Sequence, residues 1–352
     1  MLLTNVLLFA FGLALLVKGS DYLVKAAAAI AERAGVSEFV IGLTLVAVGT
    51  SIPELVSSAL AALKQESDLV LGNIVGSNIA NISLILGVAA IVAVIITRKE
   101  MLKRDGYIML FAALIFFAFV LNGVISRLEG GLFMLLYLAY SLFLFEDKPE
   151  QEDEYFKEFI RYFLWFKYLK TLKAKVHDSM NSSSKAMTAE ERAQQRRDRV
   201  DLAKNALILL ASGFAIVVGA DFLVDEALFF SEVFKISRTV IGVTMVAVGT
   251  SLPELGVTFS AARQGYGNIA VGNILGSNIA NIFLVAGVSA LIFPLAVIRA
   301  TIFYNTPFMI AISILLLIFI KTDWKITRRE GIAFLLVYAL FLCVLFYIHQ
   351  VG

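Results

Sequence analysis

The sequence predicts an all-α polytopic membrane protein in which ten transmembrane helices form two inverted-topology repeats of five. The 352-residue chain is 59% hydrophobic and 16% charged, with a mean hydropathy of +0.85, whereas about a quarter of the residues in soluble domains are charged. Apolar runs of about 18 or more residues, long enough to cross a bilayer, recur along the chain. In addition, one segment occurs twice, two hundred positions apart.

The duplicated segment consists of two motif blocks. The stretch GLTLVAVGTSIPE at 42–54 returns as GVTMVAVGTSLPE at 242–254, and GNIVGSNIANI at 72–82 returns as GNILGSNIANI at 272–282. Residues 39–81 and 239–281 are identical at about 24 of 43 positions, and such self-similarity at a fixed period indicates an internal repeat.

The apolar runs define ten spans, of which the second, third, seventh and eighth are predicted to be broken helices. The first and sixth spans are long, and polar residues in their second halves are interpreted as interfacial anchors, with Asp21 in i,i+4 reach of Lys25. These polar residues are Lys18, Asp21, Lys25, Asp221, Asp225 and Glu226. The predicted spans are 3–31, 37–63, 69–96, 106–124, 129–145, 202–231, 237–263, 268–295, 301–320 and 330–349.

Basic residues predict the orientation of these spans in the plasma membrane. Lys and Arg are concentrated in the loops 97–105, 146–201 and 321–329 and are sparse in the loops on the other side, so both termini are predicted outside and the central loop in the cytoplasm. Five spans per half force the second half to enter the membrane upside down. The predicted units are a first repeat at 1–145, a cytoplasmic loop at 146–200 and a second repeat at 201–352.

The central loop contains one segment with a distinct pattern. Residues 155–175, YFKEFIRYFLWFKYLKTLKAK, mix aromatic and basic residues at helical spacing. This pattern predicts an amphipathic helix on the inner membrane surface, in contact with anionic lipid. Regulation through a protein partner such as calmodulin is the alternative.

Span 2 carries polar groups beside a helix break. Pro53 lacks an N–H and clashes with the carbonyl of Gly49, four residues back, so this oxygen is expected to lose its helical partner, and the neighbouring carbonyls of Ala47 and Thr50 are expected to turn inward. At membrane depth such backbone is tolerated only inside protein or beside water or an ion. Thr50, Ser51 and Glu54 add side-chain oxygens within little more than one turn. Span 7 repeats the whole set, with Ala247, Thr250, Ser251, Pro253 and Glu254.

Spans 3 and 8 add hydroxyls and amides to the predicted site. Ser77 and Asn81 share one helix face, and Ser277 and Asn281 repeat the pair. Helix packing is the preferred explanation for the motif glycines and for Asn78 and Asn278. A shell made only of oxygen suits hard cations such as Ca²⁺ and Na⁺. Two glutamates balance one Ca²⁺; when the site is empty they repel each other, so it needs cations or protons to be neutral.

Other classes of function are disfavoured. No HExxH motif or nucleophile–base pair points to an enzyme, and no cofactor motif is present. The lone Cys343 cannot form an intrachain disulfide. A channel remains an alternative class, but paired carboxylates at symmetry-related positions favour a carrier.

The motifs GTSxPE and GSNxxN resemble the α-repeats of the cation/Ca²⁺ exchanger superfamily, specifically its Na⁺/Ca²⁺ exchanger branch. The resemblance covers both motif blocks and the five-plus-five layout but not the central loop. It implies alternating access, in which spans 1 and 6 slide across the other eight, with one Ca²⁺ site overlapped by up to three Na⁺ sites. Transport of three Na⁺ per Ca²⁺ would be electrogenic.

The resemblance also implies roles for individual residues. Glu54 and Glu254 would ligate Ca²⁺ with the carbonyls of Thr50 and Thr250. Asn281 stands where some relatives carry Asp, which favours K⁺ independence. The alternative is an H⁺/Ca²⁺ antiporter, although that branch carries GNxxE where this chain reads GTSxPE. The implied Na⁺ ligands are Ser51, Ser251, Ser77, Ser277 and the carbonyls of Ala47 and Ala247, with Asn81 and Asn281 lining the centre.

Overall fold

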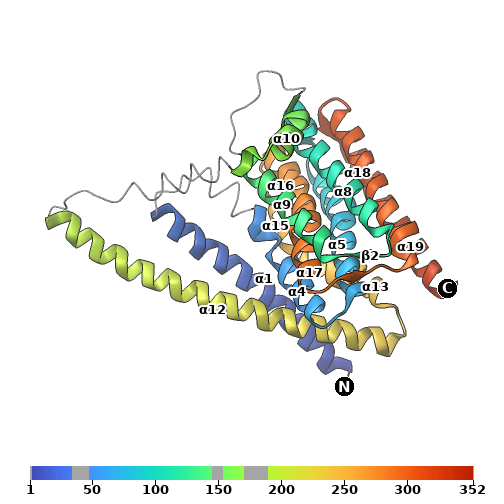
Figure 1. The fold of residues 1–352 in the computed structure, drawn as a ribbon, viewed down its shortest axis with the longest axis horizontal. Helices are drawn as coiled ribbons and strands as arrows, with labels where there is room; N and C mark the ends of the chain where they lie inside the picture. Colours follow the sequence, from blue (N-terminus) through green and yellow to red (C-terminus); the bar gives the residue numbers. More distant parts are fainter. Residues whose placement is uncertain (1, 34–46, 145–153, 170–188, 352) are drawn as a thin grey trace.

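The computed structural model describes residues 2–33, 47–144, 154–169 and 189–351, and over these residues the chain is mostly helical (Figure 1). The helices of the first half are α1 (Leu2–Arg33), α3 (Ala47–Thr50), α4 (Ile52–Leu63), α5 (Ser67–Ala80), α6 (Leu86–Val92), α7 (Lys99–Met101), α8 (Tyr107–Val120), α9 (Arg127–Phe143) and α10 (Tyr155–Leu164). Those of the second half are α12 (Ala189–Phe234), α13 (Arg238–Ile241), α14 (Ala247–Thr250), α15 (Leu252–Arg263), α16 (Gly267–Ala280), α17 (Ala286–Ile292), α18 (Thr306–Lys321) and α19 (Arg328–Val351).

The long apolar helices make this a multi-pass membrane protein. Among the described residues six helices are long and apolar enough to cross a bilayer, and a bent pair makes a seventh. The other three predicted spans match shorter helices, α4, α8 and α9, and residues 37–46 of the second span lie outside the described residues. The ten-span layout therefore stays a prediction. The six helical stretches are Leu2–Leu23, Ser67–Val92, Lys204–Phe234, Gly267–Ile292, Thr301–Lys321 and Arg328–Ile348.

The helix interruptions differ between spans. In span 7, the segment Arg238–Thr250 meets α15 at Ser251 with a bend of 50°, as expected beside a proline. Spans 3 and 8 were predicted to be broken, but each is one continuous helix with a π-helical turn, at Asn81–Ile85 and Asn281–Val285. A π turn widens the helix by one residue without interrupting it, and such turns are frequent at functional sites. Further π turns lie at Leu102–Gly106, Gly242–Val246 and Thr301–Asn305.

Four two-residue strands in the loops were not predicted. Strand β1 (Ile95–Ile96) pairs antiparallel with β4 (Lys325–Ile326), with Ile95 opposite Ile326. Strand β2 (Val124–Ile125) pairs antiparallel with β3 (Leu295–Ala296), with Val124 opposite Ala296. Each ladder joins a loop of the first half to a loop of the second. Segments this short carry no sequence periodicity, so the all-α prediction could not anticipate them.

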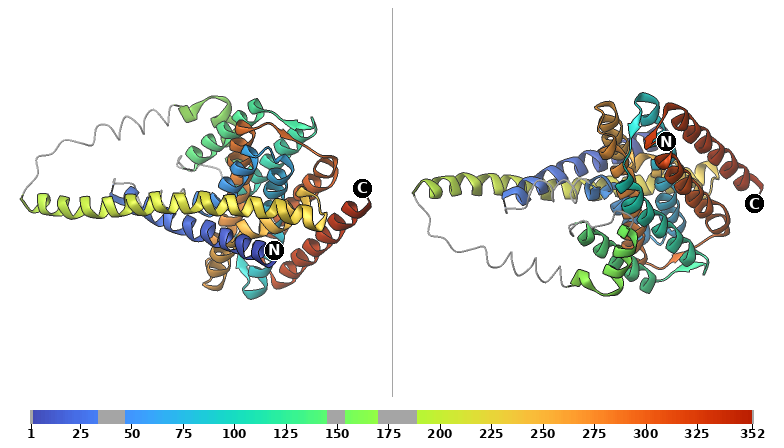
Figure 2. Two further views of the ribbon diagram at one scale, coloured as in Figure 1. Left: turned by 90° about the horizontal axis from the view of Figure 1, so that it is seen from below. Right: turned by 90° about the horizontal axis from the view of Figure 1, so that it is seen from above.

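The core consists of the two helices that carry the GSNxxN motif. In the most apolar window of Ser67–Val92, 83% of the residues are buried inside the protein, whereas the corresponding share is 17% for Leu2–Leu23 and 33% for Lys204–Phe234. Helices α1 and α12 pack on each other and lie at the side of the bundle (Figures 1 and 2). A Cβ atom on Gly219 would lie 2.6 Å from the carbonyl oxygen of Gly12, so the two backbones nearly touch where the helices cross.

Close backbone approach also holds α5 against the bent span 7. A Cβ atom on Gly76 would lie 2.6 Å from Cα of Val243 and 2.9 Å from Cβ of Ala247. We expect Gly76→Ala to lower the free energy of unfolding by about 1–3 kcal/mol, because the new methyl group cannot fit. Gly131→Ala is the matched control, since apart from the adjacent backbone of its own helix no described atom lies within 4 Å of its added Cβ. Thermal unfolding in detergent tests the pair, and equal midpoints for the two variants would contradict the packing described.

The polar residues of the long helices form contacts between helices as well as within them. Asp21 lies 4.0 Å from Lys18, and Asn5 Nδ2 donates to Oε2 of Glu226 at 2.8 Å. Lys64, at the end of α4, donates to Asp221 at 2.7 Å and to Asp225 at 2.6 Å. Of the acidic residues interpreted from sequence as interfacial anchors, Asp221 and Asp225 thus connect α12 to α4, and Glu226 connects it to α1.

Burial lowers the pKa of Lys64, but its bonds to the two aspartates outweigh this effect, so its pKa lies above the ordinary value. A raised lysine pKa stabilises the fold at all pH values below its unfolded value of about 10.4. We expect Lys64→Gln to reduce stability by about 1 kcal/mol or less, because the pair is partly exposed. The loss should shrink as salt is added. Thermal midpoints at low and high salt, with the exposed Lys321→Gln as control, test this; a loss that does not respond to salt would contradict it.

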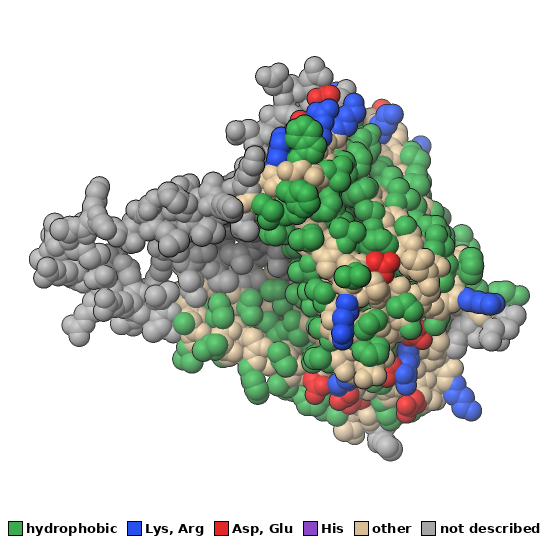
Figure 3. Space-filling model, viewed as in Figure 1, with side chains coloured by type: hydrophobic (Ala, Val, Ile, Leu, Met, Phe, Trp, Pro, Cys, Tyr) green, Lys and Arg blue, Asp and Glu red, His purple; other side chains and the backbone are tan. Residues whose placement is uncertain are grey.

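The surface is divided into zones, as expected for a membrane protein. Hydrophobic side chains cover a broad area of the face in Figure 3, between mainly basic residues at the α10 end and mixed charges at the opposite end. Large apolar residues such as Phe214 and Phe303 are about three-quarters exposed. Exposed apolar area of this extent is unusual for a soluble monomer and fits contact with lipid.

Helix α10 corrects part of the prediction for residues 155–175. Its aromatic face is buried in protein: Phe159 is fully buried, with its ring 5.6 Å from Phe143 and 6.4 Å from Phe111. That face is therefore covered by α8 and α9, not by lipid, because the aromatic residues find partners in the bundle. Trp165 and Phe166 stay exposed. Residues 170–175 lie outside the described residues, and the predicted lipid contact stays a prediction.

Candidate functional site

Two glutamates lie buried where helices begin inside the bundle. Glu54 is in the first turn of α4 and Glu254 in the first turn of α15, each directly after a proline near the helix start. Proline suits this position because its missing N–H would have no partner there. Both side chains are at most 1% exposed. The helix N-terminus is the favourable end for a carboxylate.

The carboxylates are bonded crosswise between the repeats. The Ser251 hydroxyl donates to Oε1 of Glu54 at 2.8 Å, and the Ser51 hydroxyl donates to Oε1 of Glu254 at 3.4 Å. Ser277 also donates to Oε1 of Glu254, at 3.3 Å. The Oε2 atoms of both glutamates have no hydrogen-bond partner among the described residues. Each buried carboxylate thus has an oxygen left to bind a cation or a proton.

The remaining hydroxyls of the predicted site gather around the same place. The Thr50 and Ser277 hydroxyls lie 3.4 Å apart. The Ala247 carbonyl accepts from Ser77 at 3.4 Å and from Thr250 at 3.3 Å. This carbonyl also accepts the Ser251 N–H at 3.1 Å, so it keeps its helical partner in addition to the two hydroxyls. Ala47 occupies the equivalent position at the start of α3.

Asn73 also belongs to this cluster, one turn before Ser77 on the same helix. Its Oδ1 accepts from Thr250 at 3.2 Å and from Ser77 at 3.4 Å, which joins the two repeats. Its Nδ2 donates to Ser58 at 2.9 Å. In the second repeat Asn273 donates to Thr258 at 3.1 Å. The signal in the sequence was the spacing of four residues between each of these asparagines and the following serine.

Asn81 and Asn281 meet the opposite repeat at the π turns of the two core helices. Asn81 Nδ2 donates to Asn278 Oδ1 at 3.0 Å, and Asn281 Nδ2 donates to Asn78 Oδ1 at 3.2 Å. The Oδ1 atoms of Asn81 and Asn281 are buried and have no partner among the described residues. Each is thus a buried acceptor oxygen, the kind of ligand that Ca²⁺ and Na⁺ take.

The donor set is a pair of carboxylates with neutral oxygens. Among the described residues no group of three or more His, Cys, Asp or Glu side chains could hold a metal ion. The cluster therefore differs from zinc or copper sites, which use imidazole and thiolate. Carboxylate, hydroxyl, amide and carbonyl oxygens fit a hard cation taken from water and released again.

The family model described as sodium/calcium exchanger protein matches residues 4–146 and 204–347, most of the chain. The chain belongs to this family. It is 54% identical over 351 residues to the sodium/calcium exchanger MaX1 of Methanosarcina acetivorans, covering 99% of this chain and all of that protein. It is 33% identical to the inner membrane protein YrbG of Escherichia coli, covering 94% and 92% of the two chains.

A solved structure supports the same family. The chain matches the sodium-calcium exchanger NCX_Mj, soaked with Na⁺ and Sr²⁺, with a TM-score of 0.57 and 31% identity over 97% of this chain and 98% of that one. The motifs that suggested the family, GTSxPE and GSNxxN, lie inside the matched ranges, whereas most of the central loop lies outside the family match.

Proposed function

We propose that this protein is a secondary active antiporter that exchanges Na⁺ for Ca²⁺ by alternating access, and that it is not an enzyme. The observation that carries the proposal is the crosswise pairing of Glu54 with Ser251 and of Glu254 with Ser51, which joins two buried carboxylates and two hydroxyls from opposite repeats. Relatives named as sodium/calcium exchangers over nearly the whole chain support the choice of ions.

Shared ligands explain why transport is an exchange. Ca²⁺ takes both carboxylates, and Na⁺ takes the serine hydroxyls that donate to the same carboxylates, so the two ions compete. Bound cations neutralise Glu54 and Glu254, and a neutral site crosses the apolar barrier at lower cost than a charged empty one. Three Na⁺ for one Ca²⁺ would move net charge. Asn281 adds no third carboxylate, which supports K⁺ independence.

The moving parts in this proposal are α1 and α12. They contact each other closely through Gly12 and Gly219 and lie at the side of the bundle, so they can slide as a pair past the buried core helices. Ten spans as two inverted repeats, 1–145 and 201–352, would bring the two motif copies to one centre from opposite sides. We place both termini outside the plasma membrane and the loop 146–200 in the cytoplasm.

Ca²⁺ uptake into vesicles under imposed gradients tests the function. Vesicles containing the purified protein and loaded with Na⁺ should take up Ca²⁺ when diluted into Na⁺-free buffer. An inside-positive potential should speed this uptake, because three Na⁺ leaving for each Ca²⁺ entering carry one positive charge out. K⁺ should have no effect on it. Uptake driven equally well by a pH gradient in the absence of Na⁺ would instead identify an H⁺/Ca²⁺ antiporter. Uptake that needs no counter-gradient would identify a channel.

A further inference from the structure

Four asparagines form a closed arrangement between the two core helices. Asn78 and Asn81 are three residues apart on one helix, and Asn278 and Asn281 are their equivalents on the other. All four are at most 1% exposed. Asn81 donates to Asn278 and Asn281 donates to Asn78, so each repeat supplies one donor amide and one acceptor amide. On sequence grounds, Asn78 and Asn278 are explained by helix packing alone.

The pairing decides which end of the amide is free in Asn81 and Asn281, here called the inner asparagines; Asn78 and Asn278 are the outer ones. An asparagine amide can present its oxygen or its NH₂ group, and only the oxygen attracts a cation. Asn81 and Asn281 each donate an Nδ2 hydrogen to the opposite repeat, and within the described part of the chain their Oδ1 atoms have no partner. If either amide rotated, its NH₂ group would replace the oxygen and would repel a cation.

The outer amides are themselves held in one orientation. Asn78 Nδ2 donates to the sulfur of Met309 at 3.4 Å, and Asn278 Nδ2 lies 3.8 Å from the sulfur of Met109. Asn278 Nδ2 also donates to the Asn78 carbonyl at 3.3 Å. A thioether can accept a hydrogen bond but cannot donate one. Each outer amide therefore turns its NH₂ group towards a sulfur and its oxygen towards the inner asparagine.

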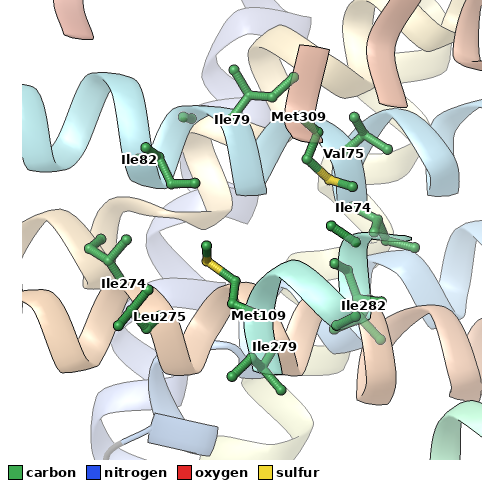
Figure 4. Close-up of a cluster of buried hydrophobic side chains, with 14 of the residues drawn as sticks. Ile74, Val75, Ile79, Ile82, Met109, Ile274, Leu275, Ile279, Ile282 and Met309 are labelled. Atoms are coloured by element: carbon green, nitrogen blue, oxygen red, sulfur yellow. The ribbon is translucent and has the colours of Figure 1, made fainter. Parts of the chain in front are cut away.

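The two methionines whose sulfurs contact the Nδ2 atoms of Asn78 and Asn278 occupy equivalent positions in the two repeats. Met109 comes from α8 and Met309 from α18, and both lie among the buried isoleucines of the core helices (Figure 4). Each reaches an asparagine of the other repeat, so the chain of contacts runs Met309–Asn78–Asn281 in one direction and Met109–Asn278–Asn81 in the other.

We propose that Asn78 and Asn278 are positioning residues of the cation site, which hold the amides of Asn281 and Asn81 with their oxygens directed to the bound ion. This inference rests on the proposed function, because it assumes a cation at the Glu54–Glu254 site. It gives the two outer asparagines a role in affinity for Ca²⁺, which they would not themselves contact.

The test is the Kd for Ca²⁺, measured calorimetrically on the full chain in nanodiscs in Na⁺-free buffer. Asn78→Leu and Asn278→Leu should each weaken Ca²⁺ binding about tenfold, the usual effect of losing one buried hydrogen bond. Asn78→Asp keeps an acceptor oxygen towards Asn281 and should bind Ca²⁺ no more weakly than the unmodified protein. If the leucine variants do not fold, Asn78→Ala and Asn278→Ala carry the same expectation without overpacking.

Two controls separate positioning from general damage. Ser313→Ala removes a buried hydroxyl whose only partner in the described part of the chain is the Met309 carbonyl of its own helix, and it should leave the Kd unchanged. The thermal midpoint in EGTA reports the fold without Ca²⁺. Leucine or alanine variants with an unchanged Kd, or an aspartate variant as weak as they are, would overturn the inference while leaving the proposed function standing. An unmodified protein that binds no Ca²⁺ would overturn both.

Discussion

The variants Glu54→Gln and Glu254→Gln are each expected to lose Ca²⁺ exchange. Each removes one of the two negative charges that balance Ca²⁺ and replaces one buried acceptor oxygen with an NH₂ group. Loss of a charged ligand in a buried site costs several kcal/mol, which corresponds to a loss of Ca²⁺ affinity of about a hundredfold or more. Vesicle uptake and the Ca²⁺ Kd both measure this loss.

The matched control for the glutamate variants is Glu129→Gln. Glu129 closes the first turn of α9 by accepting from the Ser126 N–H at 2.7 Å, far from the motif blocks in the sequence. This variant should transport Ca²⁺ at the normal rate with some loss of stability. If Glu54→Gln or Glu254→Gln retained full exchange, that residue would not belong to the site. The proposal that bound cations must neutralise both glutamates would then be contradicted.

The second large effect is expected on Na⁺ dependence. Ser251→Ala should raise the Na⁺ concentration needed for half-maximal Ca²⁺ exchange about tenfold, since it removes a neutral Na⁺ ligand and a hydrogen bond to a carboxylate. Ser51→Ala should have a smaller effect, because its bond to Glu254 is 3.4 Å long, compared with 2.8 Å between Ser251 and Glu54. Na⁺ titration of Ca²⁺ efflux from vesicles measures both.

Ser83→Ala is the control for the serine variants. Ser83 is fully buried near Asn81, but among the described residues its hydroxyl bonds only the Ile79 carbonyl in its own helix. It should leave the Na⁺ dependence unchanged. An effect of Ser83→Ala as large as that of Ser251→Ala would mean that any buried hydroxyl alters transport, and the assigned ligands would lose their support.

The repeat made much of the site predictable. Because the two copies carry Glu54 and Glu254 at equivalent positions, the predicted inverted topology would bring them together, and the structure joins each to a serine of the other copy. The bend at Ser251 follows from Pro253, since proline cannot continue the hydrogen bonding of the preceding turn. Both inferences use local chemistry and symmetry, which a sequence contains in full.

The parts that could not be predicted depend on how distant segments meet. Lys64 pairs with Asp221 across 157 residues, and nothing local to either residue marks the other as its partner. The burial of Phe159 by α8 and α9 makes an apparent membrane face into a protein interface. The bond from Asn281 to Asn78 likewise depends on the register between two core helices.

The most direct test of the account is the location of the bound cation. Crystals of this protein soaked in Sr²⁺ without Na⁺ should show one strong anomalous peak within coordination distance of Glu54 and Glu254, with Asn81 or Asn281 oxygen atoms in the shell. Adding Na⁺ to the soak should remove the peak. A Sr²⁺ peak elsewhere in the protein, with none between the two glutamates, would contradict the account.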